Sequence, residues 1–227
     1  MPVQDGEVHR GRLLLGMASA LVEKGYSATT IADVARHARV SKRTFYEHFA
    51  DKEACFIACY EAASEIAIQS ILNASSPEMP WDERVRVATE TYLSMLESNP
   101  ALTRTLMMDI YAAGPKALRI RREVQTRFAR VFRQLVDRGR DEYPGLRRLS
   151  PDMAAAVIGG VNELVLLAVE EGRAHRLTEL AGTANALMRA VLVSLFDEPS
   201  RAGRGSPAPR GRTRSTTPRR SRSRGSR

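Results

Sequence analysis

The chain has 227 residues, of which 43% are hydrophobic and 27% are charged, and its formal net charge is +9. This composition is ordinary for a globular protein, and two cysteines are too few for a scaffold held by disulfides. We expect no apolar run to reach the roughly 18 to 20 residues of a membrane span, and we therefore expect no membrane and a cytoplasmic location.

The excess positive charge lies at the end of the chain. Residues 199–227 carry ten arginines and no acid, which leaves 25 basic and 26 acidic residues in 1–198. We expect this tail, rich in Arg, Ser and Pro, to be disordered, because it has no large apolar residue to bury. An alternative function follows from it: a non-specific nucleic-acid-binding protein that acts through its basic C-terminal tail.

The first predicted helix has an amphipathic pattern. Leu14, Met17, Ala18 and Leu21 recur at helical spacing, and Gly25 is a natural stop for the helix. Two arginines followed by this apolar stretch form a weak match to a signal peptide. The helical spacing favours an amphipathic helix instead.

Two short helices separated by a tight turn follow. Thr30 can cap a helix that begins at Ile31, and Ser41 can cap another that runs to about Phe49. Val40 and Phe45 have the spacing of a hydrophobic staple. This pattern is typical of a helix-turn-helix, whose second helix lies in a major groove. The residues expected to contact double-stranded DNA are Thr30, Ser41, Lys42, Arg43, Thr44, Tyr46, His48 and Lys52.

These residue types suit the two kinds of DNA contact. Arg43 can bridge two guanine acceptors, and Thr44 can touch a thymine methyl group. Tyr46, His48 and Lys52 suit contacts to phosphates. The alternative interpretation is the polar face of an ordinary three-helix bundle.

The remainder of the chain reads as further helices. Asp51 can cap the first of them, and no sustained alternation predicts a strand. The expected ranges are 52–73, 81–98, 101–113, 116–142, 151–171 and 177–196. The arginines of 116–142 that face away from its apolar stripe are interpreted as a solvated face: Arg119, Arg122, Arg130, Arg133 and Arg140. The predicted class is all-α, with an N-terminal three-helix helix-turn-helix domain, a larger C-terminal helical bundle and about nine helices.

Residues 10–56 resemble the DNA-binding domain of TetR/AcrR-family transcriptional regulators. The matching residues are Gly25-Tyr26, Thr29-Thr30-Ile31, Asp33-Val34-Ala35, Val40-Ser41, Thr44-Phe45-Tyr46, His48-Phe49 and Lys52-Glu53. Arg39 stands where the family usually has glycine, so we expect a positive φ and some strain there. Arg43 also replaces a frequent glycine, and the hypothesis is that it shifts operator preference toward guanine.

The resemblance implies a homodimer that represses transcription at a palindromic operator and leaves the DNA when a small molecule binds. The implied domains are 1–52 for DNA binding, 53–198 for ligand binding and dimerisation, and 199–227 for the tail. The dimer would form through the last two helices, about 151–171 and 177–196, whose apolar content agrees.

We expect a small apolar or amphipathic ligand within the larger domain, because methionine and aromatic side chains make adaptable pockets. The tentative lining is Tyr92, Met95, Met107, Met108, Tyr111, Phe128 and Asn162. The alternative for each is an ordinary core position. A carrier of small molecules with vestigial DNA binding is a further possible class.

Nothing in the sequence points to catalysis, so we expect no enzyme, no cofactor and no metal. The four histidines are scattered, and no nucleophile stands beside a base. Cys55 and Cys59 lie one helical turn apart without further ligands at suitable spacing for a metal. Simple burial of the two thiols is favoured over a redox switch.

Overall fold

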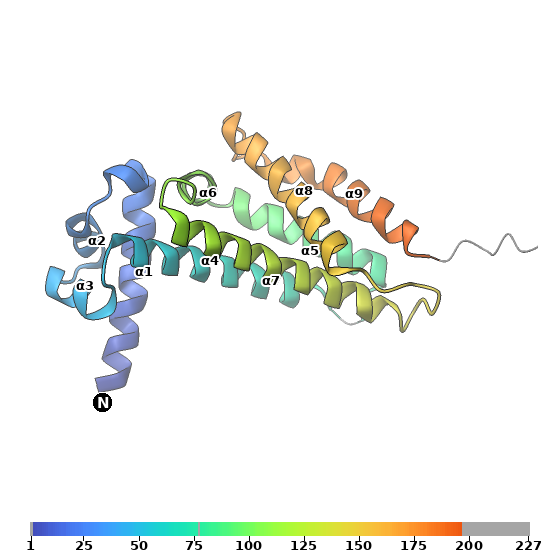
Figure 1. Cartoon of the computed structure of the whole chain (residues 1–227), viewed down its shortest axis with the longest axis horizontal. Coiled ribbons are helices and arrows are strands. Elements are labelled where there is room, and N and C mark those ends of the chain that lie inside the picture. The colour runs from blue at the N-terminus through green and yellow to red at the C-terminus, as the bar shows by residue number, and fades with distance from the viewer. Residues whose placement is uncertain (1, 77, 197–227) are drawn as a thin grey trace, which may run out of the picture. The chain divides into compact units, whose positions relative to one another are not determined.

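The computed structural model describes residues 2–76 and 78–196, and within these ranges it contains nine α-helices, one 3₁₀ turn and no strand (Figure 1). The predicted all-α class, with a helix-turn-helix domain followed by a larger helical bundle, is confirmed. The Arg-rich tail, for which we predicted disorder, lies outside the described residues.

The amino-terminal part consists of α1 (Pro2–Ala28), α2 (Ile31–Ala38) and α3 (Lys42–His48). Their shared core is fully buried at Leu13, Met17, Val34 and Phe45. α1 begins eleven residues before the predicted apolar stretch, because residues without apolar periodicity can still extend a helix. Its helical backbone is interrupted at Gly25, the predicted stop, where φ is 74°.

Gly16 lets α1 and α2 come into backbone contact. A Cβ atom at this position would lie 2.7 Å from the carbonyl oxygen of Val34 and 2.8 Å from the amide nitrogen of Ala38. Any side chain would therefore push the two helices apart.

The larger part consists of α4 to α9. The bounds are α4 (Lys52–Ala74), α5 (Trp81–Glu97), α6 (Pro100–Asp109), α7 (Pro115–Gly139), α8 (Pro151–Glu170), the 3₁₀ turn η1 (Leu177–Leu180) and α9 (Ala181–Ser194). α4 packs against α1 as well as against α5 and α7, so it joins the amino-terminal helices to the bundle (Figure 1).

Two of the predicted helix boundaries are wrong by a full turn. α6 ends at Asp109, four residues early, because the amides of Ala112 and Ala113 turn back to the Asp109 carbonyl ahead of Gly114. The last helix was expected to begin at Leu177, but its first turn is η1.

α5 and α7 are locked together around one indole ring. Trp81 Nε1 donates a 3.0 Å hydrogen bond to the carbonyl of Leu135, and a Cβ on Gly139 would overlap the ring. Next to it, the buried guanidinium of Arg84 pairs with Glu142, whose carboxylate also accepts from the Trp81 amide at 3.0 Å. This end of the bundle is therefore closely packed.

By length and composition alone, α4 and α8 would be long and apolar enough to cross a membrane, which corrects the expectation that no such run exists. The most apolar stretch of α4 is 56% buried by neighbouring helices, as in a core helix of a globular protein. That of α8 is only 33% buried, and Met153 and Leu167 are among its exposed side chains. α8 thus has an apolar face that no described residue covers.

Candidate functional site

The start of α3 is fixed by hydrogen bonds within its first turn. Ser41 is the N-cap, and its Oγ accepts a 3.0 Å hydrogen bond from the Thr44 amide. The Thr44 hydroxyl lies 3.0 Å from the same oxygen. Phe45 and Phe49 are buried with ring centroids 5.8 Å apart, and Val40 packs against the same core. The helix is therefore held by one apolar face.

The opposite face of α3 is exposed to solvent. The Arg43 side chain is 91% exposed and contacts only Glu47, one turn away, at 3.3 Å. Tyr46 is 58% exposed, and Lys42 is exposed without an ion pair among the described residues. Two cations and a phenol hydroxyl thus project from a short helix that is rigidly seated.

The turn before α3 has the strain that the sequence predicted. Arg39 has φ 53° and ψ 48°, and it is the only residue other than glycine with positive φ in the described ranges. Its carbonyl oxygen accepts a 2.7 Å hydrogen bond from the Arg12 guanidinium of α1. This contact helps to hold a backbone conformation that arginine adopts with difficulty.

Three other predicted DNA contacts have partners within the protein. Thr30 forms a capping box with Asp33, and its hydrogen bonds, with help from Lys24, hold the pKa of that carboxyl well below its usual range. The His48 ring meets that of His9 edge to face, with centroids 6.3 Å apart. Lys52 donates a 2.9 Å hydrogen bond to the carbonyl of Tyr26 and lies over its ring.

Basic side chains around α2 contact acidic side chains of the same domain. Arg36 and His37 both contact Glu23 of α1, at 3.0 and 2.6 Å. Lys24 pairs with Asp33 at 2.9 Å. The cations of α3, Lys42 and Arg43, are therefore the ones left most available to an anionic partner.

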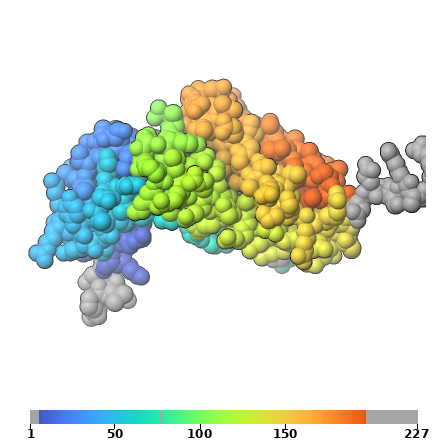
Figure 2. Space-filling model, viewed as in Figure 1, coloured from blue at the N-terminus to red at the C-terminus, as the bar shows by residue number. Residues whose placement is uncertain are grey.

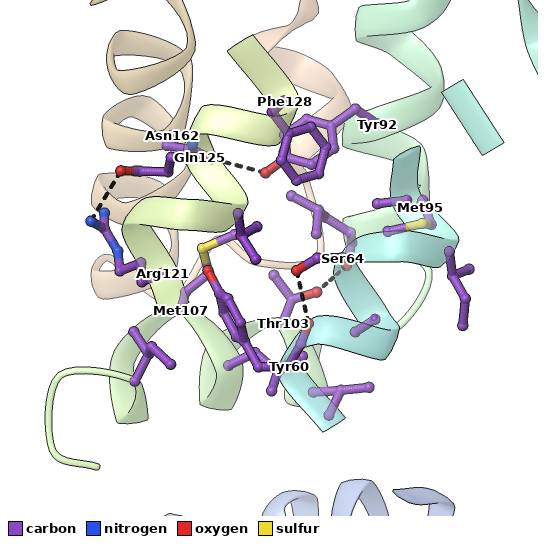
Figure 3. Close-up of a pocket in the computed structure, with 18 of the residues that line it drawn as sticks. Tyr60, Ser64, Tyr92, Met95, Thr103, Met107, Arg121, Gln125, Phe128 and Asn162 are labelled. Atoms are coloured by element: carbon purple, nitrogen blue, oxygen red, sulfur yellow. Dashed lines mark hydrogen bonds between the residues drawn. The ribbon is translucent and has the colours of Figure 1, made fainter. Parts of the chain in front are cut away.

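A cavity of about 250 Å³ lies in the larger bundle, enclosed by α4, α5, α6, α7 and α8 (Figure 3). Every predicted lining residue except Met108 borders it: Tyr92, Met95, Met107, Tyr111, Phe128 and Asn162. Met108 instead packs against the separate cluster around Leu93 and Val165. Met108 therefore does not border the cavity, whereas Met107 borders the cavity and also packs against this cluster.

The polar part of this wall was not predicted from the sequence. Tyr60, Ser64, Thr103, Arg121 and Gln125 also line the cavity. Arg121 lies 5.0 Å from the Tyr111 ring centroid and donates to Gln125 at 3.4 Å, without a carboxylate partner among the described residues. The missed signal is helical spacing, since Arg121 stands three residues before Val124 and seven before Phe128, on the apolar stripe of α7.

A second, smaller cavity of about 50 Å³ adjoins the first. Its own lining is almost wholly apolar: Ile71, Val85, Ala88, Thr89, Val131, Phe132, Leu135, Ile158, Val161 and Met188. Tyr92, Phe128 and Asn162 border both cavities. These three side chains form the wall between them.

A hydrogen bond connects α6 to the amino-terminal domain. The Asp109 carboxylate, at the end of α6, accepts a 2.7 Å hydrogen bond from the amide of Tyr26. Leu106, Met107 and Ile110, beside it, line the cavity. Tyr26 is also the residue that Lys52 of α4 contacts. The end of α6 is therefore tied to the last turn of α1.

The two cysteines are buried and free. Burial raises the pKa of both the Cys55 and the Cys59 thiols to about 12. The Cys59 thiol donates to the Leu14 carbonyl at 3.6 Å. A buried thiol with a raised pKa is a poor nucleophile, which agrees with a packing role.

Three helices around one small core, with a polar third helix exposed, define a helix-turn-helix DNA-binding protein. Residues 17–59 match the family model described as bacterial regulatory proteins, tetR family. The amino-terminal part of the chain is therefore similar to the DNA-binding domain of TetR-family transcriptional regulators.

Curated relatives include regulators and DNA-associated factors. Over 107 residues the chain is 25% identical to the HTH-type transcriptional activator FasR of Mycolicibacterium smegmatis, a match that covers 47% of this chain and about half (49%) of FasR. Over 127 residues it is 30% identical to the nucleoid occlusion factor SlmA of Vibrio vulnificus, covering 56% of this chain and 64% of SlmA.

Solved structures share the fold over most of the chain. The fatty acid degradation regulator FadR from Bacillus halodurans superposes with a TM-score of 0.68 at 19% identity, covering 79% of this chain and 93% of FadR. FadR from Bacillus subtilis in complex with stearoyl-CoA gives 0.68 at 16% identity, covering 78% and 96%. At these identities the likeness shows the fold alone.

Proposed function

We propose that the protein is a sequence-specific repressor that leaves a palindromic operator when an amphipathic acyl compound enters the cavity of its larger domain. The observation that carries this proposal is the Asp109–Tyr26 hydrogen bond, which joins a helix of the cavity to the domain that presents α3. Residues 1–52 would bind DNA, and residues 53–198 would bind the ligand and form the dimer.

Recognition of the operator is assigned to α3. Arg43 and Thr44 would meet base edges, while Lys42 and Tyr46 would flank them at the phosphates. Ser41 and Thr30 would act mainly as helix caps that expose their backbone amides to phosphates. For Lys52, the contact with Tyr26 supports a positioning role in place of a free phosphate contact.

The homodimer is assigned to α8 and α9. Met153 and Leu167 of α8 and Val193 of α9 are 43%, 45% and 67% exposed, and both helices lie at the surface in the view of Figure 2. Burial of this apolar face against a second copy would place two α3 helices around one two-fold axis. Leu167→Glu is expected to shift the protein toward monomer in analytical ultracentrifugation.

The ligand class follows from the lining of the larger cavity. Its wall is mostly apolar, which suits a hydrocarbon chain, and Arg121 supplies one cation for an anionic end. The similarity in fold to a FadR bound to stearoyl-CoA supports an acyl thioester or the corresponding fatty acid. Because such a ligand and double-stranded DNA would be met in the cytoplasm, the proposed activity is a cytoplasmic one.

Release from DNA would be a shift between two populations. A ligand that displaces Leu106 and Met107 moves α6, and Asp109 transmits this movement to Tyr26 ahead of α2. The ligand favours the state in which the two α3 helices no longer match successive major grooves.

The test of specific DNA binding is selection of sites from random double-stranded DNA by the purified full-length chain. Recovery of a palindromic consensus is the expected result. Recovery of sequences without a consensus would contradict specific binding.

The matches to nucleoid occlusion factors and the ten tail arginines favour a second candidate, a DNA-binding protein that does not respond to a small molecule. Stearoyl-CoA would then leave affinity for the selected site unchanged.

A further inference from the structure

We propose that Tyr92 and Asn162 form a gate between the two cavities and that this gate sets which acyl chain lengths the protein accepts. The inference rests on the proposed function, since it requires a hydrocarbon chain in the larger cavity. It adds a route for the chain and names the residues that limit its length.

The gate is built from three helices. The Tyr92 hydroxyl of α5 donates a 2.9 Å hydrogen bond to Oδ1 of Asn162 on α8 (Figure 3). The Tyr92 ring lies 5.5 Å from that of Phe128 on α7, tilted by 60°. The ring borders the cavities while the hydroxyl is enclosed by protein, and this burial raises the pKa of Tyr92. These side chains are the ones that line both cavities.

The sizes of the two cavities indicate that they act together. The larger, at about 250 Å³, falls below the roughly 300 to 1,000 Å³ usual for ligand sites. The smaller, at about 50 Å³, holds no ligand by itself. Joined, they reach the lower end of the usual range. A flexible linear chain can occupy two adjoining compartments more readily than a rigid ring system can.

The polarity of the two compartments gives the chain a direction. Arg121 and Gln125 lie in the first compartment, whereas the residues that line only the second carry no polar group other than the Thr89 hydroxyl and the Met188 thioether. That hydroxyl is already bonded to the Val85 carbonyl at 2.9 Å. The anionic end of the ligand therefore stays near Arg121, and the terminal methyl group advances toward Tyr92.

The gate opens when the affinity gained by burying more of the chain exceeds the affinity lost by breaking the Tyr92–Asn162 hydrogen bond. Opening leaves Asn162 Oδ1 without its donor, which costs about tenfold in affinity, the size of one buried hydrogen bond. Each methylene that enters the second compartment improves affinity by about fourfold. About two methylenes beyond the gate therefore offset its opening. Chains that end before Tyr92 leave the gate closed, and longer chains open it.

The test measures binding of octanoyl-CoA, dodecanoyl-CoA and stearoyl-CoA to the full-length chain by isothermal titration calorimetry. Tyr92→Phe removes the hydrogen bond and keeps the ring, and Ala88→Leu fills the second compartment from α5. Tyr143→Phe is the matched control, because it removes a tyrosine hydroxyl that borders neither cavity. Thermal melting of each variant checks that it is folded.

The gate predicts opposite effects on the longest ligand. Tyr92→Phe should bind stearoyl-CoA about three- to tenfold more tightly, and Ala88→Leu at least tenfold more weakly. Neither should change octanoyl-CoA binding by more than about twofold, and Tyr143→Phe should match the wild type throughout.

Two results would contradict the proposed gate, and a third would contradict the proposed function. Equal changes at all three chain lengths in Tyr92→Phe, or an unchanged length preference in Ala88→Leu, would show that the second compartment is not used. If the wild type binds none of the three thioesters, the proposed ligand class fails, and the gate with it. Since Ala88→Leu tests the second compartment without altering the hydrogen bond, the inference remains testable if Tyr92→Phe does not fold.

Discussion

The amino-terminal domain and the larger bundle bury their aromatic side chains in different ways. Phe45 is fully enclosed between α1 and α3, in a core where Gly16 brings the α1 backbone to within van der Waals contact of α2. Phe128 instead stands between two cavities. The first domain is built to hold one geometry of α3, and the second leaves space that a ligand can fill. Substitutions that compare the two parts therefore test this difference in packing.

The largest expected difference is in the response to loss of an aromatic ring. Phe45→Ala should lower the free energy of unfolding by about 3 to 5 kcal/mol, because it leaves a cavity in a close-packed core. Phe128→Ala should cost about 2 kcal/mol or less, because its ring already borders empty space. Urea denaturation measures both. Equal losses would mean that the bundle is packed as closely as the amino-terminal domain.

The next effect concerns DNA specificity alone. Arg43→Ala should cost about 1 to 3 kcal/mol in affinity for the selected operator and remove a preference for guanine at one position of each half-site. The free energy of unfolding should stay unchanged, since the side chain is 91% exposed. Arg122→Ala, also exposed but on α7, is the control and should leave the site unchanged. An unaltered consensus in Arg43→Ala would contradict the assignment of base contacts to α3.

A substitution at the contact between the two parts should weaken the coupling between ligand and DNA while both binding sites remain intact. Asp109→Asn weakens the hydrogen bond from the Tyr26 amide by removing the charge of the acceptor, an effect of about 1 kcal/mol. Stearoyl-CoA and operator should each still bind, but the reduction of DNA affinity by the ligand should shrink about fivefold. Fluorescence anisotropy of labelled operator at increasing thioester concentration provides the measurement. Full ligand response in this variant would place the coupling elsewhere.

The smallest expected effect on specificity comes from the tail. Deletion of residues 199–227 should flatten the dependence of DNA affinity on salt concentration, since fewer phosphates are neutralised, and should leave the selected site unchanged. Binding titrations between about 50 and 200 mM salt measure the slope. Loss of all site-specific binding would favour the alternative in which the tail carries the function.

The two parts also differ in how far the sequence predicts them. The caps at Thr30, Ser41 and Asp51 and the positive φ at Arg39 were predicted, because each depends on residues within a few positions along the chain. The early end of α6 was not predicted, since it depends on turn hydrogen bonds ahead of Gly114.

The lining of the cavities depends on packing between distant helices, so the sequence predicts it only in part. Met107 and Met108 are the same residue type, and both pack against the cluster around Leu93, but only Met107 also borders the cavity. Arg121 was overlooked among the many arginines of α7, although its spacing places it on the apolar stripe. The contact between Tyr92 and Asn162 joins residues 70 positions apart, and no local pattern indicates it.

The most direct test of the central claim measures the affinity of the full-length chain for its selected operator with and without saturating stearoyl-CoA, while calorimetry confirms that the thioester binds. If ligand binding releases the protein from DNA, the affinity for DNA should fall at least about tenfold, within the range usual for coupling between two sites. An unchanged affinity with the thioester bound would contradict it.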